Sequence, residues 1–430
     1  MSSFTPFSSN LPLRPLKFVA SLRSEKVDAV PSDGEYLGLE QFESWTGRLS
    51  EVELQQPPEG SANVFAKGDV LFGKLRPYLA KGWAADRAGF CTTESLVLRP
   101  QEVEPRFLRY CLLTPEFVDA VNGSTYGSKM PRADWSFIGA LKVPCPSKLL
   151  QERIANFLDE QTARIDALIA EKERLQTALE EWREAELTRI CFGGSNASEP
   201  TGSVWIQVLP KGWHLARLKH LVIGIEQGWS PECESRGAEA GEWGVLKAGA
   251  SNGGTYRDTE NKALPAELEP LPSLEVRVGD VLVSRASGSA DLVGSVAYVY
   301  ETRSRLMLSD KNFRLQFAEN PPLSPELLAW MCNTDALRQQ VRQFVSGADG
   351  LAKNIGSGSL KELWLAVPPI TMQPRLINEL RSVKLHLGAL EAHLTEHIDR
   401  LREYRSSLIS AAVTGQLNID EFQARQLNAS

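Results

Sequence analysis

A short basic stretch is the first part of this chain whose residue types could do chemistry. It holds three basic side chains and a tyrosine: Lys74, Arg76, Lys81 and Tyr78. The stretch follows an apolar run typical of a β-strand, so we expect a loop at a strand end. Basic side chains there can neutralise phosphates, and an arginine can also present two donors to a guanine. We predict a nucleic-acid contact, and a plain solvated loop is the alternative.

A glycine- and serine-rich loop follows later in the same half. Residues 122–129 read Asn-Gly-Ser-Thr-Tyr-Gly-Ser-Lys. Small residues let backbone amides approach a phosphate, and lysine or asparagine side chains can reach base edges. An ordinary connecting loop is the alternative. The predicted DNA contacts in this loop and just after it are Tyr126, Ser128, Lys129 and Arg132.

Similar candidates occur in the second half of the chain. One arginine lies in a serine-rich stretch that matches the first basic stretch, and two further residues end a second glycine-rich loop. Two weaker candidates come from a segment whose glycine, serine and asparagine residues suit any turn. Residues 41–48 form a comparable weak candidate in the first half. The second-half residues predicted to contact DNA are Lys247, Asn252, Arg285, Lys353 and Asn354.

One pattern is similar to a catalytic motif. Residues 249–253 read Gly-Ala-Ser-Asn-Gly, the spacing of a hydrolase nucleophile elbow. That motif needs a strand before it and a helix after it, whereas the turn-like Gly-Thr-Tyr-Arg-Asp follows here. The sequence has no phosphate-binding loop, no dinucleotide fingerprint and no Cys-x-x-Cys pair. We therefore expect no catalytic residue and no metal site in this chain.

The elements that must position these loops are duplicated. Residues 146–193 and 368–415 align without a gap at an offset of 222 positions, which matches Gln151 with Gln373 and Gly193 with Gly415. Apolar residues in both stretches recur at steps of three and four, as in a coiled coil. The predicted seam is Ile154, Leu158, Ile165, Leu168, Leu175, Leu179 and Trp182, then Leu376, Leu380, Val383, Leu387, Leu390, Leu394, Leu401, Tyr404 and Leu408.

A long helix with one apolar stripe is not stable alone in water. Because both copies share length, frame and flanking prolines, we predict that they form an intramolecular antiparallel pair. The alternatives are that each helix packs on its own globular domain or forms homodimers.

The fold class predicted is α+β. Two globular mixed α/β domains are separated by two long antiparallel coiled-coil helices, with a pseudo-twofold internal repeat. A single helix is expected over 105–121, and the Gly/Ser-rich segment after the first long helix is expected to be a flexible linker. The predicted divisions are domain 1 at 1–145, helix 146–193, linker 194–212, domain 2 at 213–367, helix 368–415 and tail 416–430.

Composition limits the functional classes. The net charge of −7 over 430 residues argues against coating nucleic acid through bulk charge, but it leaves room for local basic patches. The N-terminus has no basic start and no apolar run, and no window reaches 18 apolar residues, so we expect neither a signal peptide nor a membrane span. Six widely spaced cysteines fit reduced thiols in the cytoplasm.

Three features together resemble the DNA-specificity subunit of type I restriction–modification enzymes. They are the Pro-Lys-Gly-Trp sequence at 210–213, the Gly-Asp-Val-Leu-Phe-Gly-Lys-Leu-Arg-Pro-Tyr-Leu stretch at 68–79, and the repeated helix that ends in Val-Thr-Gly-Gln-Leu at 413–417. They cover nearly the whole chain in the family's order. The helix entry departs from the family's Glu-Gln, because Leu150 and Met372 precede the glutamines, and a local change in packing or partner contact is expected there.

The resemblance implies a subunit with no chemistry of its own. Each recognition domain would read one half of a split target in double-stranded DNA, and the paired helices would set the spacer and dock two methyltransferase (modification) subunits. Those subunits would carry S-adenosylmethionine, and two restriction/translocase subunits would use ATP and Mg²⁺, so this chain is expected to bind no cofactor. The main alternative is a coiled-coil scaffold that presents two protein-binding domains. An enzyme in its own right is disfavoured by the missing motifs.

Overall fold

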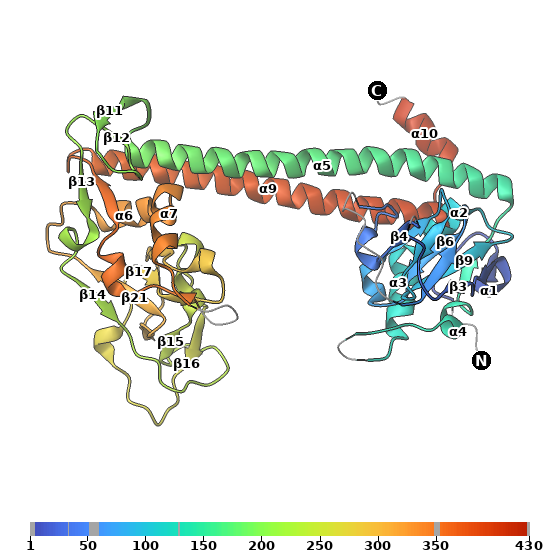
Figure 1. Cartoon of the computed structure of the whole chain (residues 1–430), viewed down its shortest axis with the longest axis horizontal. Helices are drawn as coiled ribbons and strands as arrows, with labels where there is room; N and C mark the ends of the chain where they lie inside the picture. The colour runs from blue at the N-terminus through green and yellow to red at the C-terminus, as the bar shows by residue number, and fades with distance from the viewer. Residues whose placement is uncertain (1–4, 33, 51–59, 128–129, 348–352, 428–430) are drawn as a thin grey trace. The chain divides into compact units, whose positions relative to one another are not determined.

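The computed structural model describes residues 5–32, 34–50, 60–127, 130–347 and 353–427. Its internal contacts divide the chain into two compact units. The first unit is Met1–Glu173 with Leu394–Ser430, and the second is Arg174–His393. Each unit holds a globular part and one half of each long helix (Figure 1). The long helices are α5 (Lys148–Phe192) and α9 (Gln373–Val413).

A four-stranded antiparallel sheet lies at the centre of the first unit, with strand order β2-β9-β6-β7. Its strands are β2 (Ala20–Leu22), β9 (Ser95–Pro100), β6 (Val70–Gly73) and β7 (Gly82–Ala84). All four residues of β6 are buried, as the apolar run in the sequence predicts. This strand therefore anchors the predicted basic loop that follows it.

A second sheet in the first unit has the order β3-β5-β8-β4, and β4 runs parallel to β8. These strands are β3 (Lys26–Val27), β5 (Ala62–Phe65), β8 (Gly89–Cys91) and β4 (Tyr36–Leu37). The remaining short elements are β1 (Leu13–Pro15), α1 (Leu16–Val19), α4 (Trp135–Ile138) and β10 (Lys142–Pro144). Strand β1 pairs with β10 immediately before α5 begins.

Two helices occupy the region where the sequence predicts a single one. They are α2 (Pro105–Leu112) and α3 (Pro115–Gly123). The side chain of Thr114 accepts a hydrogen bond from the backbone N–H of Phe117, and Pro115 occupies the first position of α3. A capping threonine followed by proline starts a new helix rather than continuing the old one. The prediction of one helix over 105–121 is therefore wrong.

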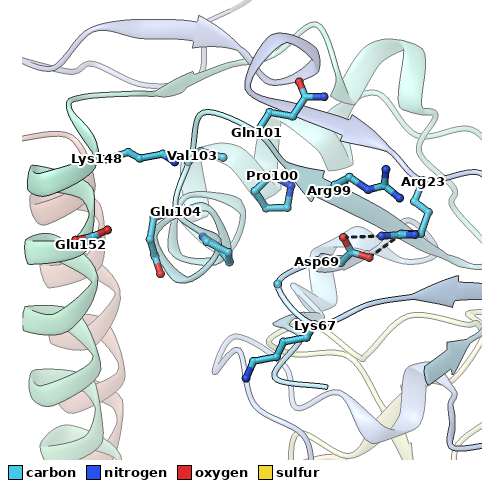
Figure 2. A pocket seen from close by; sticks show the side chains of 12 residues that line it. Arg23, Lys67, Asp69, Arg99, Pro100, Gln101, Val103, Glu104, Lys148 and Glu152 are labelled. Carbon is cyan, nitrogen blue, oxygen red and sulfur yellow. Dashed lines mark hydrogen bonds and ion pairs between the residues drawn. The ribbon is translucent and has the colours of Figure 1, made fainter. Parts of the chain in front are cut away.

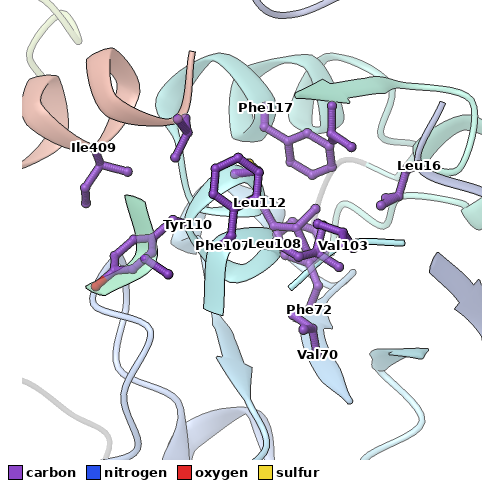
Figure 3. Packing of buried hydrophobic residues seen from close by; sticks show 14 of the residues in the cluster. Leu16, Val70, Phe72, Val103, Phe107, Leu108, Tyr110, Leu112, Phe117 and Ile409 are labelled. Atoms are coloured by element: carbon purple, nitrogen blue, oxygen red, sulfur yellow. The ribbon is translucent and has the colours of Figure 1, made fainter. Parts of the chain in front are cut away.

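The hydrophobic core of the first unit joins the main sheet to the helices (Figure 3). Phe72 of β6 meets Phe117 of α3 edge-to-face, with ring centroids 5.8 Å apart. Phe107 of α2 is fully buried, and Leu158 of α5 and Ile409 of α9 belong to the same cluster. Both long helices therefore contribute directly to the core on which the globular part of this unit depends.

The second unit repeats this plan element by element. Its main antiparallel sheet has the order β14-β21-β17-β19, the counterpart of β2-β9-β6-β7. These strands are β14 (Gly224–Gln227), β21 (Asn312–Gln316), β17 (Val281–Ser284) and β19 (Val296–Tyr298). The smaller sheet contains β16 (Asn261–Ala263), β15 (Gly244–Leu246) and β20 (Leu306–Met307). Other counterparts are β13 (His214–Arg217), α6 (Pro325–Cys332), α7 (Asp335–Phe344), α8 (Ser357–Leu360) and β23 (Trp364–Val367).

The matching glutamines have the same role in both units. The Gln151 side chain accepts from the backbone N–H of Glu104 (2.6 Å) and donates to the carbonyl of Pro146 (2.8 Å). The Gln373 side chain accepts from the N–H of Ser324 (2.7 Å) and donates to the carbonyl of Pro368 (3.0 Å). Both side chains are buried. Each glutamine thus joins the start of a long helix to the loop before a short helix.

The two long helices pack against each other within each unit, and the predicted antiparallel pairing is confirmed. In the first unit the Arg405 guanidinium on α9 lies 2.8 Å from the Asp166 carboxylate on α5. In the second unit Arg183 on α5 lies 3.0 Å from Glu391 on α9. The start of each helix therefore faces the end of the other.

The predicted seam is right for the first part of each helix, and beyond it every second seam position shifts by one residue, while Leu394 and Leu408 stay buried as predicted. On α9 the apolar stripe continues through Ile398, which is 3% exposed, whereas Leu390 and Tyr404 are 42% and 47% exposed. On α5 Leu168, Leu175 and Trp182 are likewise exposed. The shift follows two successive four-residue steps, at 161–165–169 and 383–387–391. Two four-residue steps in succession correspond to a stutter, the insertion of four residues into a heptad pattern, which brings the repeat closer to the natural helical period.

Two segments outside the repeats are ordered. Within the predicted flexible linker 194–212, β11 (Ala197–Pro200) pairs with β12 (Val208–Pro210) as a hairpin. Its Ile206 and Leu209 are buried in the core of the second unit, so apolar anchors outweigh the flexible composition. In the predicted tail, α10 (Ile419–Leu427) places Phe422 against Phe157 of α5, with centroids 5.3 Å apart. No helix of the described residues is both long and apolar enough to span a membrane.

Candidate nucleic-acid interface

The basic loop of the first unit follows β6 and has an unusual backbone. Arg76 and Ala80 both adopt the left-handed conformation, with φ of 50° and 45°, on either side of a 3-10 turn at Pro77–Leu79. This region is unfavourable for residues other than glycine, so surrounding contacts must hold it. The N–H of Arg76 donates to the carbonyl of Pro131 (2.8 Å). The result is a fixed turn in which the Arg76 and Tyr78 side chains are exposed.

The glycine- and serine-rich loop of the first unit lies beside this turn. Backbone groups of Tyr126 and Arg132 exchange two hydrogen bonds (3.2 and 3.1 Å), and Leu75 pairs with Arg132 across the two loops. Tyr126 is 65% exposed. The structure therefore brings Arg76, Tyr126 and Arg132 into one loop cluster, as a shared binding surface requires. The predicted contacts Ser128 and Lys129 lie outside the described residues.

Some of the predicted contact residues are also engaged within the protein. The Arg132 guanidinium forms two hydrogen bonds with the Glu94 carboxylate (2.9 and 3.0 Å). The Lys81 ammonium donates to the carbonyl of Leu39 (2.6 Å). The weak candidate region at 41–48 is joined to the basic loop by the N–H of Trp45, which donates to the carbonyl of Ala80 (3.0 Å). Arg76, by contrast, has no acidic partner among the described residues. These three residues stay predictions as DNA contacts, with Arg76 the one most available to a ligand.

Glu94 is a residue that the sequence reading missed. Besides pairing with Arg132, it accepts through its backbone carbonyl a hydrogen bond from the N–H of Lys74 (2.9 Å), and the carbonyl of Lys74 accepts from Ala133 (3.0 Å). Glu94 therefore organises both loops at once. An acid between two basic loops is the only signal that could have indicated it.

The second unit builds the same arrangement from different residues. The short strands β18 (Ala286–Ser287) and β22 (Lys353–Asn354) pair directly, and Ser346 exchanges backbone hydrogen bonds with Asn354 (2.9 and 2.8 Å). The loop after β17 thus meets the loop after α7, just as the loop after β6 meets the loop after α3. Arg285, Lys353 and Asn354 are brought together, as the sequence predicts.

Arg285 is positioned by the neighbouring strand. Its guanidinium donates to the carbonyl of Asp310 (3.0 Å) and lies over the Phe313 ring, 5.8 Å from the centroid. Burial acts to raise the pKa of Asp310, but hydrogen bonds from Ser230 and Lys311 outweigh it and hold that pKa below its ordinary value. Asp310 therefore remains charged near Arg285. The Lys353 ammonium donates to the carbonyl of Gly347 (2.8 Å).

The weak candidates Lys247 and Asn252 lie next to the same loops. The Asn312 side chain donates to the carbonyl of Lys247 (3.0 Å) and accepts from the Ser251 hydroxyl (2.8 Å). Because Asn312 also pairs with Ser284 at the end of β17, this segment is fixed near Arg285. The Asn252 side-chain oxygen is buried without a partner among the described residues. The nucleophile-elbow pattern at 249–253 forms a 3-10 turn and not a strand-to-helix elbow.

A polar pocket lies at the opposite end of β6 and is not part of this interface. It measures about 480 Å³, and Figure 2 shows Lys67 and Asp69 before β6, with Lys148 and Glu152 on α5. Arg23 is paired with Asp69 at 2.8 Å. Four basic and three acidic residues line the pocket, so it has little net charge for an anion. Among the described residues no group of three His, Cys, Asp or Glu could hold a metal ion.

Comparisons with known proteins agree with this architecture. The chain is 34% identical over 173 residues to the type I restriction enzyme EcoEI specificity subunit of Escherichia coli, covering 40% of this chain and 29% of that one. It is 23% identical over 323 residues to the StySPI specificity subunit of Salmonella potsdam, covering 74% of this chain and 67% of that one. No family model matches the chain.

The fold is also that of a solved protein. A structure described as the basis of complex assembly and conformational transition of the type I R-M system has a TM-score of 0.71 at 19% identity, covering 95% of this chain and 100% of that one. At this identity the match concerns the fold alone. The resemblance to type I specificity subunits that the sequence motifs predict is therefore confirmed, in sequence by the curated relatives and in architecture by this structure.

Proposed function

We propose that this chain is the sequence-recognition subunit of a type I restriction–modification complex and reads a bipartite target in double-stranded DNA. One observation carries the proposal. Each unit has an equivalent pair of loops beside its main sheet, but the side chains in the two pairs differ. They are Arg76, Tyr78 and Tyr126 in the first unit, and Arg285, Lys353 and Asn354 in the second. Equivalent loops with different chemistry suit two half-sites of different sequence.

The side chains suit DNA in both roles that recognition requires. Lysine and arginine neutralise phosphates and supply affinity, while arginine, asparagine and tyrosine can discriminate base edges. The net charge of −7 does not oppose this, because the basic side chains of the loops act locally, and part of the acidic excess lies on the first long helix, where residues 146–193 hold ten acids against seven bases. Unfavourable bulk charge lowers non-specific binding more than it lowers local, specific contact.

The proposal assigns chemistry to partner proteins. Two methyltransferase subunits would carry S-adenosylmethionine and methylate adenine, and two restriction/translocase subunits would use ATP and Mg²⁺. This chain would bind none of these cofactors. Similarity to named specificity subunits supports the division of labour. We also propose a cytoplasmic location, supported by six free cysteines, of which four are buried.

A protein-binding scaffold is the second candidate. Large apolar side chains on the long helices are exposed, including Trp182 (51%) and Leu385 (73%). Exposed apolar groups on a helix pair fit a protein partner. They are equally expected in a DNA-recognition subunit that must hold methyltransferases, so they do not favour the scaffold alone.

Direct DNA binding separates the two candidates. The chain would be co-purified with its methyltransferase partner, and fluorescence anisotropy would measure its affinity for duplexes that contain or lack the target, at several salt concentrations. The proposal predicts discrimination of about 10³-fold or more, with affinity that falls as salt rises. Equal, weak affinity for all duplexes, together with a stable protein complex, would support the scaffold instead.

A further inference from the structure

The internal repeat allows the junction between globular part and long helices to be compared in the two units. Gly47 and Gly254 have the same left-handed backbone (φ 75° and 74°). A Cβ at Gly47 would meet Leu113, and a Cβ at Gly254 would meet Asn333, and these two residues end equivalent helices, α2 and α6. The loops at 45–47 and 252–254 are therefore equivalent.

In the first unit, side chains of the protein fill the part of this junction that lies between the loop and the long helices. The Arg405 guanidinium on α9 donates to the carbonyls of Trp45 (3.0 Å) and Thr46 (3.2 Å) and pairs with Asp166 on α5 at 2.8 Å. Arg405 is only 8% exposed. The Arg109 side chain of α2 packs beside the same loop, near Gly47. A pocket of about 580 Å³ lies beside Gly47 on the other side of the loop, but five basic residues line it and none of its lining residues belongs to α5 or α9.

In the second unit the residues that correspond to Arg109, Asp166 and Arg405 leave the equivalent space open. Ala329 stands at the place of Arg109, and Gly388 stands at the place of Asp166. Arg183, the counterpart of Arg405, pairs instead with Glu391, one helical turn beyond Gly388 (3.0 Å). The result is a pocket of about 360 Å³, entirely within the second unit and lined mainly by apolar groups.

The pocket has the chemistry of a site for a large apolar side chain. Its walls include Tyr298, Tyr300 and Trp330, together with Leu387 of α9. The carboxylate of Glu326 is already bound by Arg381 (2.7 and 2.5 Å) and by the Tyr300 hydroxyl (2.8 Å). Aromatic walls favour an apolar or aromatic occupant over a charged one. The indole N–H of Trp330 is buried without a hydrogen-bond partner among the described residues, so it remains as a donor to such an occupant.

Gly388 is a second observation that points to an occupant. Glycine is among the least favourable residues in a helix interior. Yet no described atom outside the neighbouring helix backbone lies within 4 Å of the place where a Cβ at Gly388 would stand, so packing inside the chain does not require glycine there. A glycine in a long helix is explained when another molecule approaches the helix backbone closely.

The rim of the pocket indicates the charge of the partner. The ammonium of Lys384 lies over the rings of Trp330 (5.5 Å) and Tyr300 (5.8 Å) and has no carboxylate partner among the described residues. Glu391 and Glu326 are both engaged by arginines. The rim therefore offers an unneutralised positive charge, which complements an acidic residue beside the inserted side chain.

We propose that this pocket of the second unit receives an aromatic or branched apolar side chain, flanked by an acidic residue, from the methyltransferase subunit. The inference rests on the proposed function and adds the anchoring residues. It also makes the two units unequal, because five basic residues line the pocket beside Gly47 in the first unit, and Arg405 and Asp166 occupy the side next to the long helices. One methyltransferase copy is therefore anchored at the second unit in a way that the other copy lacks.

The test fills the pocket without disturbing the fold. Gly388→Leu adds a side chain into open space at a helix position where leucine is favourable, so thermal stability should stay the same or rise. Ala389→Leu is the matched control, because residue 389 is exposed on the same helix and does not line the pocket. Lys384→Glu tests the rim charge independently.

Affinity for the purified methyltransferase subunit would be measured for each full-length variant. Gly388→Leu and Lys384→Glu are expected to weaken association at least tenfold, and Ala389→Leu is expected to match the unsubstituted chain. Equal affinity of all variants would overturn the pocket assignment and leave the proposed function intact. If Gly388→Leu fails to fold, unchanged affinity of Lys384→Glu would overturn it. Failure of the unsubstituted chain to associate would overturn both proposals.

Discussion

Arg76 has a backbone conformation that is held by its neighbours and a guanidinium group that is exposed to solvent. Its left-handed conformation is held by the hydrogen bond to Pro131 and by the 3-10 turn that follows, while its guanidinium has no acidic partner among the described residues. Arg132, which follows Pro131 in the neighbouring loop, is instead paired with the Glu94 carboxylate. Because its backbone is already fixed, Arg76 avoids the cost of ordering the loop when it binds, and only the ordering of its side chain, about 0.5–1.5 kcal/mol, remains.

Removing the Arg76 side chain should affect one half of the target only. We expect Arg76→Ala to weaken binding by about 1–3 kcal/mol if the guanidinium reads a guanine, and to relax selectivity in a single half-site. Binding to duplexes with substitutions in either half would measure this. Lys67→Ala, an exposed lysine of the polar pocket at the other end of β6, is the control. Unchanged affinity and selectivity of Arg76→Ala would exclude this loop as a contact.

At the residue scale, sequence reasoning located the loops but not their internal partners. Basic and glycine-rich segments after apolar runs can be recognised in the amino-acid sequence, so Arg76, Arg285 and Lys353 could be selected as candidates. The pairing of Arg132 with Glu94 and of Lys81 with Leu39 depends on strands that are distant in sequence. The left-handed conformation of Arg76 has no signature, because arginine rarely adopts it.

The long helices show how the heptad reading succeeds and then slips. Steps of four and three place Leu158 and Ile165 on α5, and Leu380 and Leu387 on α9, in the buried seam. Beyond Ile165 and Leu387 every second position of the buried stripe moves by one residue on both helices, while Leu394 and Leu408 stay in it. An α-helix has about 3.6 residues per turn, so a strict 3.5-residue pattern drifts away from the partner unless a stutter corrects it.

Two substitutions measure this shift. Ile398→Ala removes a buried seam side chain that the strict heptad pattern leaves out, and should lower the free energy of unfolding by about 2–5 kcal/mol. Leu390→Ala removes a side chain that the strict pattern places in the seam but that is 42% exposed, and should lower it by about 1 kcal/mol or less. Denaturant unfolding would measure the free energy of unfolding of both variants. A larger loss for Leu390→Ala than for Ile398→Ala would show that the strict heptad seam is the correct one.

The same reasoning explains what was missed at other elements. Composition predicted flexibility for 194–212, but Ile206 and Leu209 anchor a hairpin there. Thr114 and Pro115 divide the expected single helix in two, a signal that was present in the sequence. In each case a few local residues outweighed the average character of the segment, which is why segment averages failed.

For the whole molecule, duplication is the property that the sequence expresses most clearly. The long helices match without a gap at an offset of 222 positions, and the order of strands in the main sheets is the same in both units. The globular parts tolerate insertions, because their loops are exposed, whereas a coiled coil must keep its length and frame. Two matching sets of helices and sheets that carry different loops suit a protein that recognises two half-sites of different sequence.

The central claim is that the two units read two half-sites separated by a fixed gap. The most direct measurement is single-molecule sequencing of genomic DNA from cells that co-express this chain with its methyltransferase partner. The account predicts adenine methylation at one split motif, with two specified halves and a gap of constant length. Methylation at a continuous motif, or at a motif with a variable gap, would contradict it.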